Sequence, residues 1–228
     1  MALSHSPRMV TDGLMTYLDA ANSRSYSGSG NTWYDLLGRI NFTLQNSPPF
    51  LANSAGGSIG FTAANNHWAS SSNNLSLMTR FTVEVWHYYT GANTGPAPCI
   101  VTETYYGSTG QINVNLGSTT NANGLRVGFY NGGWNDSSTY TLSANNWYHI
   151  SGTFDGTNLR LYINGINQVT TPNGGTPTAN TGGMRLMRRW DSDEYWGGQL
   201  STVKIYNRAL SAAEIKQNFE ATRDRYGI

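Results

Sequence analysis

The chain has little charge, a single cysteine and no long apolar run. Only 12% of its 228 residues are Asp, Glu, Lys or Arg, whereas disordered chains and helical bundles carry many charges on solvated surfaces. Cys99 stands alone, which excludes a disulfide within the chain. No stretch approaches the roughly 18 apolar residues of a membrane span, and residues 1–10 lack the apolar segment of a secretory leader. We therefore expect no membrane contact and no cleaved leader.

The two signs of charge are nearly balanced. A formal net charge of +1 lacks the basic excess typical of nucleic-acid binding, so we expect no nucleic-acid partner. Arg185, Arg188 and Arg189 form one dense basic cluster. We interpret it as the solvated end of a strand and its loop, and contact with an anionic ligand or partner is the alternative.

Alternation of apolar and polar residues is the main positive signal. Within residues 81–89, Phe81, Val83 and Val85 share one face of a predicted strand, because successive side chains of a strand point to opposite sides. One face then meets the core and the other meets water or a ligand. The same pattern predicts strands over residues 39–44, 111–116 and 124–129.

The strongest local signals are two hairpins and one helix. Asp155-Gly156 and Asn164-Gly165 separate apolar runs and readily take the positive φ angles of tight hairpin turns, which predicts an antiparallel meander. Ser211 with Glu214 three residues later forms a capping-box pattern. It predicts a helix over about residues 212–222, docked on the sheets.

Four segments, taken together in order, carry a family resemblance. They are residues 12–20 with 33–36, residues 81–86, residues 147–165 and residues 198–211. They resemble a laminin G-like, concanavalin A-like lectin (jelly-roll) domain that spans residues 12–228. The opening and closing segments also resemble versions found in bacteriophage virion proteins.

The resemblance implies an all-β fold, a jelly-roll sandwich of two antiparallel sheets with one short C-terminal helix. Such folds serve as lectins, glycosidases, adhesion modules and virion components, so the fold does not fix the function. Glucan-cleaving relatives resemble one another in a strand with Glu-x-Asp-x-x-Glu. Here Glu84 is followed by Trp86 and Tyr89 at the two later acidic positions, so we expect no enzyme.

Glu84 has two interpretations. It is a half-buried acceptor for backbone or Tyr hydroxyl donors, or one of a catalytic pair completed by Glu103 from another strand. Glycoside hydrolysis needs two carboxylates, roughly 5 to 9 Å apart. We favour the first interpretation.

No metal-binding motif is present. The four histidines lack zinc-ligand spacing. Carboxylates that could bind calcium occur as Asp191, Asp193 and Glu194, or as Asp19 with Asp35, without a specific spacing. We expect no cofactor, and Asp191 and Asp193 are the candidate ligands if calcium binds.

Two loops combine aromatic and polar side chains, the chemistry with which proteins bind sugars. Tyr105-Tyr106 adds aromatic surface at another loop. In the alternative interpretation, Trp190 and Trp196 cover the core edge while the acids solvate a turn. The candidate ligand-binding residues are Trp134, Asn135 and Asp136 in residues 131–136, and Trp190, Asp191, Asp193 and Glu194 in residues 189–196.

The resemblance to phage proteins, the missing leader and the absent catalytic acids favour a non-enzymatic virion protein that decorates a bacteriophage head. An N-terminal arm over residues 1–11 has little periodicity, so we expect it to become ordered against other virion proteins such as the capsid lattice. The alternative is a carbohydrate-binding adhesin, or a tail-associated receptor-binding module, whose loops recognise cell-surface glycans.

Overall fold

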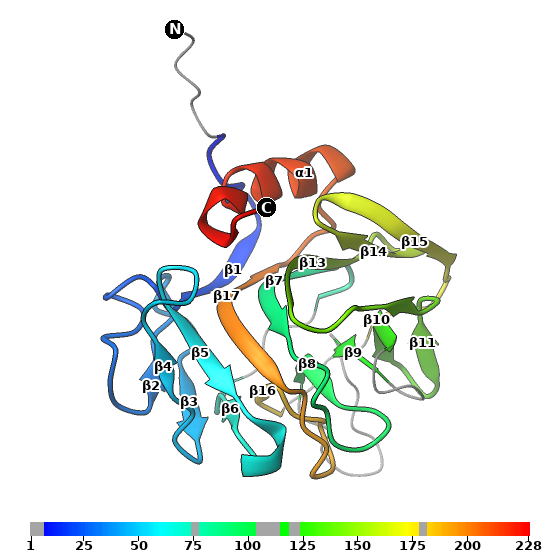
Figure 1. The fold of residues 1–228 in the computed structure, drawn as a ribbon. Coiled ribbons are helices and arrows are strands. Elements are labelled where there is room, and N and C mark those ends of the chain that lie inside the picture. The colour runs from blue at the N-terminus through cyan, green and yellow to red at the C-terminus, as the bar shows by residue number, and fades with distance from the viewer. Residues whose placement is uncertain (1–6, 74–77, 104–114, 119–123, 178–181) are drawn as a thin grey trace, which may run out of the picture.

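The computed structural model describes residues 7–73, 78–103, 115–118, 124–177 and 182–228. Within these ranges the strands form two antiparallel sheets packed face to face, with one α-helix near the C-terminus (Figure 1). This arrangement confirms the predicted all-β sandwich.

Sheet 1 is built around three adjacent strands of nine residues each, β13 (Asn146–Phe154), β7 (Phe81–Tyr89) and β17 (Gly198–Tyr206). Its spatial order is β15 (Ile166–Pro172), β14 (Asn158–Ile163), β13, β7, β17, β5 (Ser58–Phe61) and β4 (Phe50–Leu51), with β1 (Leu14–Asp19) also paired to β17.

Sheet 2 is made of shorter strands. Its spatial order is β11 (Trp134–Asp136), β10 (Gly124–Tyr130), β9 (Asn115–Gly117), β8 (Cys99–Glu103), β16 (Met184–Leu186), β6 (Trp68–Ser70), β3 (Phe42–Gln45) and β2 (Thr32–Trp33), with β12 (Tyr140–Thr141) paired to β10. The helical elements are η1 (Ala63–Asn65), α1 (Ala212–Glu220) and η2 (Arg223–Tyr226).

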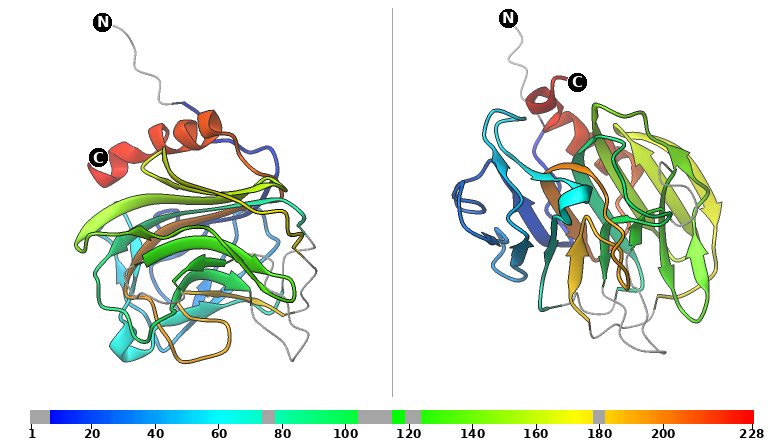
Figure 2. Two further views of the ribbon diagram at one scale, coloured as in Figure 1. Left: turned by 90° about the vertical axis from the view of Figure 1, so that its right-hand side faces the viewer. Right: turned by 60° about the horizontal axis from the view of Figure 1, so that its bottom comes forward.

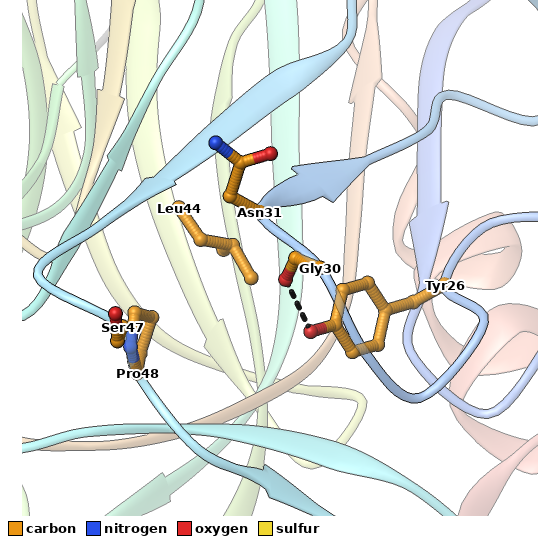
Figure 3. Close-up of a pocket in the computed structure, with 6 residues that line it drawn as sticks. All are labelled: Tyr26, Gly30, Asn31, Leu44, Ser47 and Pro48. Atoms are coloured by element: carbon orange, nitrogen blue, oxygen red, sulfur yellow. Dashed lines mark hydrogen bonds between the residues drawn. The ribbon is translucent and has the colours of Figure 1, made fainter.

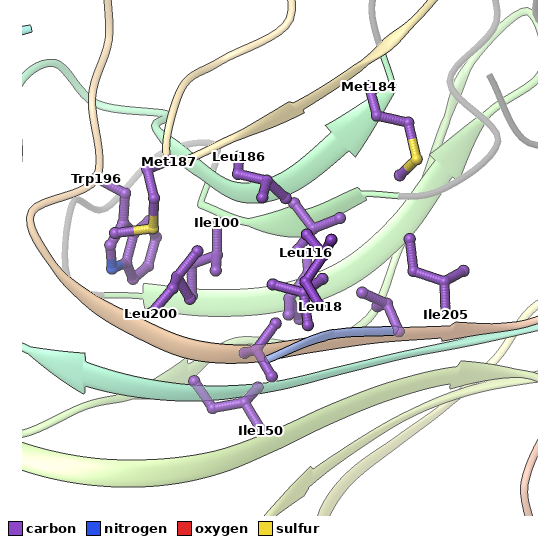
Figure 4. Packing of buried hydrophobic residues seen from close by; sticks show 14 of the residues in the cluster. Leu18, Ile100, Leu116, Ile150, Met184, Leu186, Met187, Trp196, Leu200 and Ile205 are labelled. Atoms are coloured by element: carbon purple, nitrogen blue, oxygen red, sulfur yellow. The ribbon is translucent and has the colours of Figure 1, made fainter. Parts of the chain in front are cut away.

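The main core lies between the two sheets (Figure 4). Phe81, Val83 and Val85 of β7 point into it, as their alternation predicts, and face Leu116 and Leu186 of sheet 2. Each fully buried side chain of this size contributes about 1.5–3 kcal/mol. The side chains between these core residues therefore lie on the outer faces of the sheets.

Both predicted hairpins are confirmed. Phe154 pairs with Leu159 across the first turn, and Ile163 pairs with Ile166 across the second. Asn164 and Gly165 have φ values of 51° and 77°, and both of these angles are positive, as a type I′ turn requires. The meander β13–β14–β15 follows from this local turn chemistry.

The strand predicted over residues 39–44 is shorter than expected and spans Phe42–Gln45. The cause is Asp35, whose Oδ2 accepts the backbone N–H groups of Arg39 and Ile40. Those amides are therefore held in a loop and cannot join a sheet. Residues 111–114 of another predicted strand lie outside the described residues, and β9 begins at Asn115.

Helix α1 covers the outer face of sheet 1, which the alternation of β7 assigned to water or a ligand. Figure 2 shows the helix on one side of the sandwich. The indole ring of Trp86 stacks on Tyr226, with centroids 3.7 Å apart, and on Phe219 at 5.9 Å. The capping box of Ser211 and Glu214 is present. The helix ends at Glu220, two residues before the predicted end.

The buried polar centre of this interface is Glu84. Its carboxylate lies 2.7 Å from Nζ of Lys204, accepts a hydrogen bond from Nδ2 of Asn218 at 2.9 Å, and lies 3.3 Å from Nε2 of His149. Glu84 is 1% exposed, so it is fully buried, and its donors are side chains of Lys204 and Asn218 in place of the predicted backbone or Tyr hydroxyl donors.

Part of the predicted N-terminal arm is bound to the chain itself. The backbone N–H of Val10 donates to Asn218, and Gln217 donates to the carbonyl oxygen of Arg8. These residues were predicted to become ordered against a neighbouring protein. Helix α1 already contacts residues 8–10 of this chain, because Asn218 and Gln217 satisfy backbone groups there. Contact between the arm and another protein stays a prediction. No helix in the described part of the chain could span a bilayer.

Candidate functional site

The two loops predicted to bind a ligand meet at one edge of sheet 2. The rings of Trp134 and Trp190 lie 4.7 Å apart between centroids, and Trp134 also contacts Tyr130 at 5.2 Å. Trp134 is 44% exposed, whereas Trp190 is 4% exposed. Trp134 is therefore the accessible ring, and Trp190 and Tyr130 support it from beneath.

The register of β10 and β11 explains how Trp134 reaches this place. Trp134 pairs with Tyr130 across a tight turn in which Gly132 has a φ of 95°. Residues Trp134–Asp136 form a strand, whereas the sequence predicted a loop. The side chain of Asn135 donates to Asn131 within the turn, so it helps to fix the hairpin.

The acids of the second loop are held by arginines. Arg189 forms ion pairs with Asp191 at 2.9 Å and Glu194 at 2.6 Å, and Arg188 pairs with Asp193 at 2.6 Å. These arginines compete with a cation for the carboxylates of Asp191 and Asp193, the candidate calcium ligands.

The other candidate pair of acids, Asp19 and Asp35, is held by hydrogen bonds and an ion pair within the chain. Asp35 accepts N–H groups from four residues, and Asp19 pairs with Arg225 at 2.9 Å. Among the described residues, no three His, Cys, Asp or Glu side chains are grouped as metal ligands would be.

Asp136 belongs to a polar group on the outer face of sheet 2. Because Leu125, Val127 and Phe129 point into the core, Arg126 and Gly128 lie on the opposite face. Asp136 lies opposite Gly128 in the register and pairs with Arg126 at 3.3 Å. Burial raises the pKa of Asp136 to about 6, although Arg126 acts in the other direction.

Asn115 lies beside this group with its hydrogen-bonding capacity unused. It pairs with Gly128 in the register and is fully buried. Neither Nδ2 nor Oδ1 of Asn115 has a hydrogen-bond partner, and the same holds for Oδ1 of Asp136 and Nε of Arg126. Buried polar atoms normally find partners, and here two donors, Nδ2 and Nε, and two acceptors, the Oδ1 atoms, lack one.

The basic cluster is not the solvated strand end that its sequence suggested. The guanidinium groups of Arg185 and Arg188 lie 5.3 and 4.5 Å from the ring centroid of Trp68, and Arg189 lies 4.5 Å from that of Trp190. All three arginines are half-buried. Flat aromatic faces attract arginine because the ring quadrupole favours a cation.

Glu84 and Glu103 do not form a catalytic pair. Glu84 lies on the outer face of sheet 1 with Trp86, under helix α1, whereas Glu103 belongs to sheet 2. The backbone of sheet 1 therefore stands between the two carboxylates.

Trp196 is a core residue. It is fully buried, and its Nε1 donates a hydrogen bond to His87 at 3.0 Å. Tyr105-Tyr106 lies outside the described residues.

A separate pocket of about 500 Å³ lies near the opposite edge of sheet 2 (Figure 3). The hydroxyl of Tyr26 donates to the carbonyl oxygen of Gly30 beside it, and the other lining residues are Asn31, Leu44, Ser47 and Pro48. It shares no residue with the surface formed by Trp134, Trp190 and Tyr130, which we call the Trp134 surface.

The comparisons place the chain in a family. A family model described as the concanavalin A-like lectin/glucanases superfamily, of the laminin G type, matches residues 62–216. The chain belongs to this superfamily. Its sheets and helix are those of a concanavalin A-like β-sandwich. A search of curated protein sequences gives no match.

Solved structures share the fold at low sequence identity. Domain 4 of the extracellular arabinanase AbnA from Geobacillus stearothermophilus, solved with arabinotriose, is 16% identical with a TM-score of 0.71, over 90% of this chain and 97% of that one. The binding domain of Paraclostridial Mosquitocidal Protein 1 is 17% identical with a TM-score of 0.68, over 91% of this chain and 52% of that one.

Trypanosoma rangeli sialidase is 14% identical with a TM-score of 0.66. The match covers 97% of this chain but 36% of the sialidase, so it concerns only part of that enzyme.

Sequence reasoning missed Trp68, Tyr130 and Arg126. Trp68 stands at an unremarkable position between η1 and a serine-rich segment, and its partners lie more than a hundred residues later. Arg126 was inside the strand predicted over residues 124–129, and Tyr130 directly follows it; both lie on the face away from Val127. Their alternation with core residues is the signal that could have found them.

Proposed function

We propose that this protein binds carbohydrate through the surface formed by Trp134, Trp190 and Tyr130. The observation that carries the proposal is the contact between Trp134 and Trp190, 4.7 Å apart, which leaves one face of an indole exposed on a rigid support. Sugar rings stack on such faces because their C–H surfaces are apolar while their hydroxyls stay available for hydrogen bonds.

The polar group next to Trp134 supports this proposal. Asp136 and Arg126 place a carboxylate and a guanidinium, 10% and 17% exposed, on the same outer face of sheet 2 as Trp134. The arabinanase domain was solved with arabinotriose, and the mosquitocidal-protein neighbour is described as a binding domain. Both agree with a binding role for this fold.

We propose a binding module and not an enzyme. Glu84 is held by Lys204 and Asn218 beneath helix α1, so its carboxylate is engaged and covered. Detectable polysaccharide cleavage that is lost when Glu84→Gln is combined with Lys204→Met, in a protein that stays folded, would contradict this part of the proposal.

Glycan-array binding followed by calorimetric titration tests carbohydrate binding. We expect Trp134→Ala to weaken binding by about 10- to 30-fold, because aromatic anchors contribute about 2 kcal/mol or more. Tyr34→Ala is the matched control, since Tyr34 is 50% exposed and follows β2 at the opposite edge of sheet 2. A folded protein that binds no glycan would contradict the proposal.

We further propose that this protein is part of a bacteriophage particle. It would lie on the head surface, and its N-terminal arm would contact other virion proteins. The segments that resemble phage proteins include β1 and β17, which pair with each other along Leu14–Asp19. Mass spectrometry of purified virions tests this, and complete absence from virions would remove it. Tail placement, as a receptor-binding module, would appear as co-purification with tails.

A further inference from the structure

Aromatic rings and guanidinium groups form one continuous row beyond the Trp134 surface. From Trp134 the row passes to Trp190, and from there to Arg189 at 4.5 Å. The carbonyl oxygen of Arg189 then accepts a hydrogen bond from Nη1 of Arg185 at 3.0 Å. We call this row the arginine–aromatic strip: Tyr130, Trp134, Trp190, Arg189, Arg185, Trp68, Arg188 and Tyr195.

Arg185 differs from the other arginines of the strip. Arg188 and Arg189 are paired with carboxylates, whereas no carboxylate among the described residues lies within ion-pair distance of Arg185. Within the same part of the chain, its guanidinium makes one hydrogen bond, to the carbonyl oxygen of Arg189. The remaining donors of Arg185 are available for a ligand, and a guanidinium matches a carboxylate in a bidentate fork.

The position of Arg185 on β16 places its side chain on the same face of sheet 2 as the Trp134 surface. Met184 and Leu186 point into the core, so Arg185 lies on the outer face of sheet 2. Burial lowers the pKa of Arg185, and the nearby charge of Arg188 acts in the same direction. Asp191 and Asp193 act in the other direction without cancelling these effects, so an anion beside the guanidinium would relieve them further.

The strand register places polar side chains beside Arg185, in the direction of the Trp134 surface. Arg185 pairs with Thr102 on one side and with Ser70 on the other, and Thr102 pairs with Asn115. Thr102 and Asn115 are fully buried, so Ser70, which is half-buried, is the one of these side chains whose hydroxyl can meet a sugar hydroxyl.

We infer that the bound glycan carries a carboxylate, which Arg185 binds beside Trp68 while a neighbouring sugar stacks on Trp134. This inference rests on the proposed carbohydrate binding and adds the chemical class of the ligand, an acidic sugar such as a uronic or sialic acid residue. The carboxylate and the stacked ring are recognised by different side chains of the same strip.

A densely charged polymer fits this surface poorly. Arg126, Arg188 and Arg189 already face the carboxylates Asp136, Asp191, Asp193 and Glu194. These acids would repel a chain with one phosphate or sulfate per unit, because nucleic-acid binding depends on uncompensated basic charge. A glycan with isolated carboxylates meets only the unpaired Arg185.

The test uses an array of matched probes, each acidic glycan beside its methyl ester, with oligogalacturonate and sialyllactose as the first two pairs. We expect the wild-type protein to prefer the acid over the ester by at least about tenfold in calorimetric titrations, because hydrogen bonds to charged groups contribute about 1.5–3 kcal/mol. Arg185→Gln should remove that preference and keep the binding of the ester. Arg24→Gln, an exposed arginine outside the strip, is the control for net charge.

The outcomes separate the two proposals. Equal binding of acid and ester by the wild-type protein, or a preference that survives Arg185→Gln, overturns the inference while carbohydrate binding stands. Binding of neither form, or tighter binding of single-stranded DNA, overturns both. Arg185→Lys keeps the charge without the fork and should retain part of the preference, which shows that a loss in Arg185→Gln does not come from misfolding.

Discussion

Asn218 joins the two ends of the chain, because its Oδ1 accepts the backbone N–H of Val10 at 2.8 Å. The Nδ2 group of the same side chain donates to Glu84 at 2.9 Å and to the hydroxyl of Tyr206 at 3.1 Å. One buried amide thus connects the N-terminal segment, the C-terminal helix and sheet 1. Few substitutions of the side chain could meet all three partners, since they require both a donor and an acceptor.

We predict that Asn218→Ala lowers the free energy of unfolding by about 1–3 kcal/mol, because it removes the hydrogen-bond partner of the Val10 N–H and of Oε2 of Glu84. Hydrogen exchange should rise at the amides of residues 8–11. Lys216→Ala on the exposed side of the same helix is the control and should change little. Unchanged exchange in Asn218→Ala would contradict the role of this amide.

The buried pair of Glu84 and Lys204 should be sensitive to the loss of one partner. Glu84→Gln leaves Lys204 charged and 1% exposed, so we predict a loss of about 3–5 kcal/mol in urea unfolding at neutral pH. Glu84→Gln combined with Lys204→Met should recover most of that loss, because no buried charge remains. Additive effects of the two substitutions would argue against a direct interaction.

The same pair predicts the response to acid. Burial acts to raise the pKa of Glu84, but the charges and hydrogen bonds of Lys204 and His149 together outweigh it and hold the pKa well below its usual range. A depressed pKa in the folded state means that the contribution to stability is complete above the unfolded pKa of about 4.5 and is lost as the pH falls below it. Unfolding measured from pH 6 downward should show a steeper decline in the wild type than in the double variant.

Asp136 should show the opposite dependence on pH. Burial raises its pKa to about 6 from the ordinary 3.8, so the folded state binds a proton more tightly than the unfolded state. Its contribution to stability is present below 3.8 and is lost as the pH rises through about 6. Asp136→Asn should remove that slope from the pH dependence of unfolding. Arg126→Gln should move the carboxyl titration, followed by NMR, to higher pH.

Gly128 should be required for the placement of β11. A Cβ at this position would overlap Oδ1 of Asp136 and lie 2.6 Å from the carbonyl oxygen of Asn135. We predict that Gly128→Ala lowers stability by about 1–3 kcal/mol and weakens glycan binding, because the strand that carries Trp134 must shift. Gly133→Ala in the adjoining turn meets nothing within 4 Å and should be neutral. Equal melting temperatures for the two variants would show that β11 adapts without cost.

The parts of the fold that the sequence predicted are those determined locally. The turn at Asn164-Gly165 and the cap at Ser211 depend on residues within a few positions of each other, and both are present. The burial of Glu84 could not be predicted in this way. Its partner Asn218 comes from helix α1, 134 residues later, and strand alternation alone does not reveal a second layer over a sheet.

The candidate site was predicted in its residues but not in its arrangement. Aromatic and polar composition identified Trp134 and Trp190 separately. Their contact depends on the order of β11, β10, β9, β8 and β16 in sheet 2, in which β16 enters from a distant part of the chain. The cation–π contacts of Trp68 have the same origin, because β6 neighbours β16.

The attachment of helix α1 and residues 8–10 to the outer face of sheet 1 sets an orientation for the whole molecule. The arginine–aromatic strip lies on the outer face of sheet 2, on the far side of the core. A particle or protein joined to either terminus would therefore lie on the sheet 1 side of the sandwich. The arginine–aromatic strip would then face away from it, toward the surrounding medium. Many copies on one scaffold would all present that surface outward, so that weak single contacts could add up to firm adhesion.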